Sequence, residues 1–182
     1  MPLPPPVERQ HLHTRTFQFS GYRRGDGLWD IDGHMTDIKT YGFKNDFRGE
    51  IGPEEPLHDM WIRLTLDDDF LVHDIEAATE AAPYQVCPQI TPNFKKVIGV
   101  RVGRGWRQKI RERVGGVEGC THLVELLGAM ATVAFQTIYP VLAKTATARA
   151  STQKPVLIDS CHAFRADGEV VKKTWPDFYT GS

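Results

Sequence analysis

The chain lacks the features that mark exported or membrane-anchored proteins. It has 3 cysteines in 182 residues, an odd and sparse set that builds no disulfide framework. Residues 1–6 hold no basic region followed by an apolar core, so they predict an extended lead rather than a signal peptide. No apolar run approaches the roughly 20 residues needed to cross a bilayer. These absences predict a cytoplasmic protein with reduced thiols.

An excess of charge of either sign is also missing. With 22 basic and 23 acidic residues, the formal net charge is -1. This balance gives no support to nucleic acid or an acidic membrane as a partner. We therefore predict a small-molecule substrate, no nucleic-acid and no membrane partner, and leave a homo-oligomer open. One basic cluster could bind an anionic substrate or form a solvated helix face: Arg101, Arg104, Arg107, Lys109, Arg111 and Arg113.

Alternation of polar and apolar residues predicts an antiparallel sheet. Residues 14–22 and 28–39 form a hairpin, and residues 60–66 and 70–75 add two strands around an aspartate turn. In the second strand, Trp29, Ile31 and Met35 share one face. The other face carries Asp30, Asp32, His34 and Thr36. We expect a loop over residues 40–57.

Helical patterns follow the strands. Residues 77–82 are small and helix-compatible, residues 92–99 and 106–114 predict short helices, and residues 122–139 predict a long one. Strands followed by helices indicate an α+β fold, with an antiparallel sheet of about four strands, helices on one face and the long helix central. We divide the chain into a disordered lead (1–13), one α+β domain (14–143), a linker (144–154) and an extension (155–182). That extension is expected to pack on the domain and to contain a brief strand at residues 156–158.

A glycine-rich stretch over residues 115–119 introduces the candidate site. Behind it, Cys120 and His122 begin the long helix, a setting that suits a transition metal or an activated thiol. Cys87 lies near another helix start, and His58 and Asp59 open a strand. If these ends meet, Cys87, Cys120 and His122 would be metal ligands with His58 as a fourth. Three protein ligands and an open position would suit catalysis by zinc or non-haem iron.

Two further roles complete the predicted site. His58 or Asp59 could act as the general base instead of as a ligand. The polar face and the turn before it offer substrate-binding candidates, although such rows are also typical of a solvated sheet face: Asp26, Asp30, His34 and Arg63.

A resemblance enters at these residues. His58-Asp59-Met60 precedes an alternating strand, Asp67-Asp68-Asp69 makes a turn, and Cys87 and Cys120-Thr121-His122 head the later helices. Over about residues 55–140 this order resembles the iron–sulfur scaffold proteins of the IscU/NifU/SufU type. The resemblance matches Asp59 to the family aspartate, Cys87 to the second cysteine and Cys120 to the last, with His58 at or beside the first. It implies an IscU-like core with an added hairpin and tail, and an iron–sulfur cluster as cargo.

The whole chain also resembles an uncharacterised bacterial domain family, whose activity is not established. The matching positions are Arg23-Arg24, Asp26-Gly27-Leu28-Trp29, Asp37-Ile38-Lys39, His58-Asp59-Met60, Pro83-Tyr84 with Cys87, Gly105-Trp106 and Gly119-Cys120-Thr121-His122-Leu123. The leading hypothesis is therefore a metal-dependent enzyme acting on a small organic substrate. The alternatives are a carrier of metal, sulfur or a cluster, a metal-free cysteine-nucleophile enzyme, and a purely structural protein.

Overall fold

The structure is a computed structural model that describes residues 2–145 and 154–181. The chain folds into two compact units, Met1–Lys144 and Thr145–Ser182, and each unit is described by itself. The first unit holds an antiparallel sheet and the longer helices, so the α+β class is confirmed.

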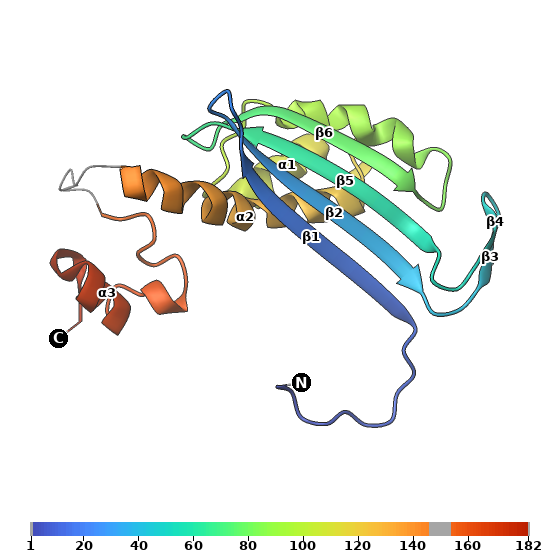
Figure 1. The fold of residues 1–182 in the computed structure, drawn as a ribbon, viewed down its shortest axis with the longest axis horizontal. Coiled ribbons are helices and arrows are strands. Elements are labelled where there is room, and N and C mark those ends of the chain that lie inside the picture. The colour runs from blue at the N-terminus through green and yellow to red at the C-terminus, as the bar shows by residue number, and fades with distance from the viewer. Residues whose placement is uncertain (1, 146–153, 182) are drawn as a thin grey trace. The chain divides into compact units, whose positions relative to one another are not determined.

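Four antiparallel strands form the sheet of the first unit, in the order β1-β2-β5-β6 (Figure 1). They are β1 (His13–Arg23), β2 (Trp29–Lys39), β5 (Pro56–Leu66) and β6 (Val72–Ala81). The expected loop between β2 and β5 instead contains a small separate hairpin of β3 (Phe43–Asn45) and β4 (Gly49–Ile51). Short strands of this length carry too few residues for alternation to reveal them.

One face of the sheet is buried and the other is open. Trp29, Ile31 and Met35 of β2 are buried, as are Met60 and Ile62 of β5, while the residues between them are more exposed. This is the period-two alternation of a strand with one face on a core. The predicted division of β2 into an apolar and a polar face is confirmed.

The helices cover the buried face (Figure 1). They are η1 (Cys87–Val97), α1 (Trp106–Val114), η2 (Gly116–Glu118) and α2 (Thr121–Thr145). The buried side chains of α2 join those of the sheet in one core: Leu123, Leu126, Leu127, Met130, Ala134 and Ile138. The Trp106 indole donates to the carbonyl oxygen of Leu127 at 3.1 Å and so ties α1 to α2.

Two glycines of the sheet let α2 approach closely. A Cβ added at Gly21 of β1 would lie 2.0 Å from Oγ1 of Thr137, and one at Gly33 of β2 would lie 3.2 Å from Cδ1 of Leu126. Only a residue without a side chain fits at the first position unless Thr137 moves. The packing of the central helix therefore depends on glycine as well as on apolar contacts.

Some predicted elements are wrong in type or extent. Residues 77–81 continue β6 rather than forming a helix, because their partners on β5, Ala77 to Ile62 and Ala78 to Trp61, hold them in the sheet. The helix expected at 92–99 is η1, which starts earlier, at Cys87. The long helix extends past Pro140 to Thr145, because a proline can lie inside a helix when packing supports its flanks.

The second unit contains short helical elements: η3 (His162–Phe164), α3 (Glu169–Thr174) and η4 (Pro176–Phe178). Val171 is fully buried, and the rings of Phe164 and Trp175 lie 5.9 Å apart. Residues 156–158 form a turn and not the expected strand. The predicted linker 144–154 lies largely outside the described residues, and packing of the extension on the domain stays a prediction.

One helix, α2, is long and apolar enough over Thr121–Lys144 to cross a membrane, judged by length and composition alone. The sequence expectation of no apolar run near this length did not single out this helix, whose mean hydropathy is 1.6. The finding is weak evidence for a membrane span, because a core helix has the same properties. Side chains of α2 are indeed part of the core against the sheet.

Candidate functional site

A buried carboxylate, that of Asp37, lies at the centre of the candidate site. Asp37 continues the row of β2 that begins with Trp29 and Ile31, so its side chain enters the helix-covered face at the end of the strand. The register places Arg15 of β1 opposite it on one side and His58 of β5 opposite it on the other. Directly opposed residues share one face of a sheet, so the three side chains meet.

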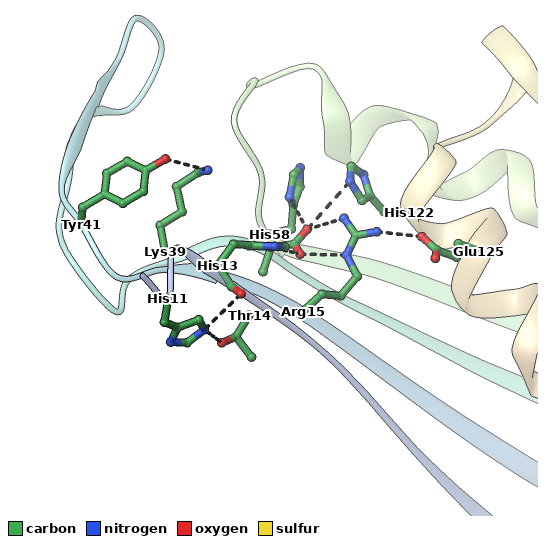
Figure 2. A network of polar contacts seen from close by, with 10 residues as sticks. His11, His13, Thr14, Arg15, Lys39, Tyr41, His58, His122 and Glu125 are labelled. Carbon is green, nitrogen blue, oxygen red and sulfur yellow. Dashed lines mark hydrogen bonds and ion pairs between the residues drawn. The ribbon is translucent and has the colours of Figure 1, made fainter. Parts of the chain in front are cut away.

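Basic side chains surround both carboxylate oxygens of Asp37, and Figure 2 labels His13, Arg15 and His58 among them. Arg15 makes a fork, with Nε donating to Oδ1 at 2.8 Å and Nη2 donating to Oδ2 at 2.7 Å. Nε2 of His13 lies 2.8 Å from Oδ1, and Nδ1 of His58 lies 2.9 Å from Oδ2. The remaining donor of Arg15, Nη1, binds Glu125 of α2 at 2.8 Å.

His122 brings the first turn of α2 to the same carboxylate. Its Nε2 lies 3.9 Å from Oδ2 of Asp37, and its ring centroid lies 3.9 Å from that of His58. Asp37, His58 and His122 each offer one ligand atom, and these atoms lie within 4.8 Å of one another. Two imidazoles and a carboxylate are a ligand set used by zinc and non-haem iron sites.

Electrostatics fixes the protonation states of this cluster. Burial alone would raise the pKa of the Asp37 carboxyl, but hydrogen bonds from Arg15 and His13 outweigh it and hold that pKa well below its usual range. Burial lowers the pKa of His58, and the nearby His122 adds to this effect. Burial also lowers the pKa of His122, with Arg15 contributing. These shifts favour an ionised carboxylate beside two neutral imidazoles at neutral pH.

The glycine-rich lead-in positions Cys120 and His122. A Cβ added at Gly119 would lie 1.8 Å from the carbonyl oxygen of Val114, so the chain can fold back tightly from α1 only with glycine there. The carbonyl oxygen of Cys120 accepts the first helical hydrogen bond of α2, from the amide of Val124 at 2.9 Å. Cys120 is thus the N-terminal cap residue of α2 and is half-buried.

The predicted metal ligands are brought together only in part. His58 and His122 meet, but the third member of the group is Asp37, and neither cysteine belongs to it. Sγ of Cys120 lies 3.8 Å from Nδ1 of His122, on the opposite edge of that ring from Asp37. Cys87 begins η1 and is half-buried, with its amide bound to the carbonyl oxygen of Tyr84. The structure therefore brings together Asp37, His58 and His122, and metal binding by the predicted Cys87, Cys120, His122 and His58 stays a prediction.

The predicted general base Asp59 lies outside the cluster. Successive residues of a strand point to opposite faces, so Asp59 faces away from His58. Its carboxylate binds Nε2 of His34 at 2.8 Å, and the His34 ring stacks on Trp61 with centroids 3.6 Å apart. The structure thus places Asp59 and His58 on opposite faces of the sheet, and a catalytic role for Asp59 stays a prediction.

The predicted substrate-binding residues also lie apart from the cluster. Asp26 pairs with Arg24 in the β1–β2 turn, Asp30 accepts from Thr65, and Arg63 forms a fork with Asp32 on the open face. His34 shares that face. Seven residues of strand, roughly 23 Å at about 3.3 Å each, separate Asp30 from Asp37. Binding of a substrate there stays a prediction about a different surface.

Sequence reasoning missed four residues of the network: Asp37, Arg15, His13 and Glu125. A signal for Asp37 was present, because alternation from Trp29 places this charged residue on the apolar face. A charged residue in a core row is almost never fully buried unless it is paired. Its partners could not be found in the same way, because they depend on strand register and on the position of α2.

Comparisons with known proteins add a family and no activity. A family described as "Protein of unknown function (DUF2889)" matches residues 13–136, more than half of the chain and all of the cluster. No curated protein and no solved structure matches. The comparisons show no likeness to the IscU-type scaffold proteins.

Proposed function

The chain belongs to the DUF2889 family of unknown function, and we propose from its site that it is a metal-dependent enzyme that uses zinc or non-haem iron on a small organic substrate. Asp37, His58 and His122 would hold the ion. The observation that carries the proposal is the approach of three ligand atoms to within 4.8 Å of one another.

The distances suit an ion of this size. Bonds of about 2.0–2.2 Å place neighbouring ligand atoms roughly 2.8–3.6 Å apart for octahedral to tetrahedral angles. Oδ2 of Asp37 lies 2.9 Å from Nδ1 of His58 and 3.9 Å from Nε2 of His122. An ion would require Nε2 of His122 to approach Oδ2 of Asp37 by at least about 0.3 Å, and the three ligand atoms to draw in from the 4.8 Å within which they lie.

The charges around the cluster also allow a cation. Both imidazoles have lowered pKa values, so they are neutral and can ligate at pH 7. Arg15 opposes a cation, but Glu125 binds its far side and offsets part of this charge. Arg15 and His13 would act as the outer partners that fix the carboxylate, a role that commonly orients metal ligands.

Three protein ligands leave coordination positions for substrate or water, which is the catalytic arrangement. The ion would polarise a substrate oxygen or supply hydroxide near neutral pH. The chain would contribute orientation: the Arg15 fork fixes Asp37, and the sheet register fixes His58 beside it.

Cobalt binding to metal-free, untagged protein tests the proposal. We expect one Co²⁺ per chain with visible absorption, and no thiolate-to-metal charge-transfer band, because the ligands are nitrogen and oxygen. His58→Gln and His122→Gln should each lower affinity by at least tenfold. His34→Gln is the matched control, since His34 also pairs with an aspartate at 2.8 Å but lies on the open face.

Several outcomes would contradict the site. If His34→Gln lowered the cobalt affinity as much as His58→Gln and His122→Gln do, the cobalt would be binding to histidines in general and not at the cluster. A charge-transfer band that disappears in Cys120→Ser would show that Cys120 is a metal ligand, as the sequence predicted. Absence of any stoichiometric binding would reject the metal.

A second candidate is a metal-free thiol enzyme, favoured by one observation. Sγ of Cys120 lies 3.8 Å from Nδ1 of His122, and Nε2 of the same ring faces Asp37 at 3.9 Å. This order of thiol, imidazole and carboxylate is that of a nucleophile, its base and an orienting group. Faster iodoacetamide alkylation of Cys120 than of Cys161, slowed by His122→Gln, would support it. Cys161 is the exposed reference thiol.

A further inference from the structure

A groove lies beside the cluster, between α1 and the first turns of α2. Its volume is about 590 Å³, and it is lined by Arg107, Ile110 and Arg111 of α1 and by Cys120, Thr121, Val124, Glu125 and Gly128 at the α2 side, with Gly115 and Gly116 between them. Ile110 and Val124 are the apolar side chains of this lining. The wall of α1 carries two guanidinium groups, so the groove combines apolar area with positive charge.

The two arginines of this wall have no acidic partner among residues 2–145 and 154–181. Two cations of the neighbouring η1 do have acidic partners: Lys95 pairs with Asp74 and Glu76, and Lys96 pairs with Glu118. The carboxylate of Glu125, which also lines the groove, is taken by Arg15 at 2.8 Å. Arg107 and Arg111 thus stand one helical turn apart with like charges and repel each other.

The helix opposite allows these side chains to lie close to it. Nη1 of Arg107 lies 3.4 Å from the position of a Cβ at Gly128 of α2. On the same side, Cys120 and Thr121 begin α2, and the next residue is His122 of the cluster. A group held by the arginines would therefore lie within a few residues of the candidate metal ligands.

We propose that this groove binds an oxyanion, the carboxylate or phosphate of a small organic molecule, with Arg107 and Arg111 as a clamp. Guanidinium groups match the geometry of both anions with paired hydrogen bonds. The half-buried Val124 offers a contact to the apolar part of the molecule. The role of the groove as the substrate subsite of an enzyme rests on the proposed function, whereas its binding of an anion does not.

Titration of metal-free protein with inorganic phosphate, and separately with acetate, tests the proposal by amide NMR. We expect chemical-shift changes that saturate with anion concentration at the amides of the groove glycines Gly115, Gly116 and Gly128. The anion that binds with higher affinity shows which headgroup fits. Arg107→Gln and Arg111→Gln should each weaken phosphate binding at least fivefold, and the double variant should abolish it. Lys109→Gln removes the same charge from an exposed position of α1 outside the groove and should leave binding unchanged.

The result that overturns the proposal is equal weakening by Lys109→Gln, or shifts that rise linearly without saturation, since either means general attraction to a basic helix. Circular dichroism checks that the exposed substitutions leave the fold intact. Cobalt and phosphate titrations of the unsubstituted protein separate the two proposals. Phosphate binding without cobalt binding refutes only the metal enzyme, and cobalt binding without phosphate binding refutes only the groove.

Discussion

Replacement of Asp37 by asparagine tests whether the buried carboxylate of Asp37 and its ion pairs stabilise the fold. Asparagine has nearly the same shape, but it places an amide group where one carboxylate oxygen accepts bonds from Arg15 and His58. Removal of one partner of a fully buried ion pair costs about 3–5 kcal/mol. The Arg15 side chain is 30% exposed and keeps Glu125 as a partner, so it regains part of its solvation. We therefore expect a loss of about 2–3 kcal/mol at pH 7.

The matched control lies on the same strand. Asp32 makes the same fork with Arg63, at 2.7 and 2.8 Å, but on the open face where Arg63 is 56% exposed. Asp32→Asn should cost below about 1 kcal/mol. Urea unfolding followed by tryptophan fluorescence, with chelator present, measures both variants. If the two substitutions cost the same, burial does not decide the strength of these forks and the reasoning fails.

The pH dependence gives a second measurement on Asp37. Its carboxyl has a lowered pKa in the folded protein. Ionisation of this group therefore stabilises the folded state by its full amount at every pH above about 4, the usual pKa in the unfolded chain. That stabilisation is lost as the pH falls toward the lowered value. Asp37→Asn should therefore remove part of the acid-induced loss of stability between about pH 4 and pH 2. An unchanged acid profile would contradict the strong pairing.

Two further predictions concern the histidines and the central helix. His58 and His122 have lowered pKa values in the folded protein, so the unfolded chain binds more protons below about pH 6.5. Metal-free protein should therefore lose stability as the pH drops through this point. The urea midpoint of unfolding should fall less over this pH range in His58→Gln than in the unsubstituted protein. Gly21→Ala places a methyl group 2.0 Å from Oγ1 of Thr137 and should cost about 1–3 kcal/mol in thermal unfolding. Thr137→Ala in the same chain should recover part of that cost, and no recovery would place the strain elsewhere.

Much of the sheet could be predicted because alternation is a local property. The hairpin of β1 and β2, the two faces of β2 and the span of α1 agree with the sequence expectations. The helix predicted at residues 77–81 was wrong because alanine suits a helix in isolation, whereas pairing with β5 decides the conformation of these residues. The strands β3 and β4 were not predicted because three residues are too few for a pattern.

The candidate site was predictable only as separate pieces. His58 and His122 stood out because one opens a strand and the other follows a glycine-rich turn before a long helix. Asp59 was equivalent to His58 in the sequence, yet adjacent strand residues face opposite sides, and the sheet carries only His58 to the cluster. The cysteines looked like ligands because their chemistry suits metals, although geometry places Cys120 on the far edge of the His122 ring.

The sequence by itself determined most of the four-stranded sheet, the long helix and which residues could ligate. Tertiary structure alone decided that Arg15, Asp37 and His58 form one row and that α2 adds His122 to it. The physical reason is distance along the chain. Periodicity reports neighbours within a few residues, whereas this cluster joins three strands and a helix through register and packing, which no local pattern encodes.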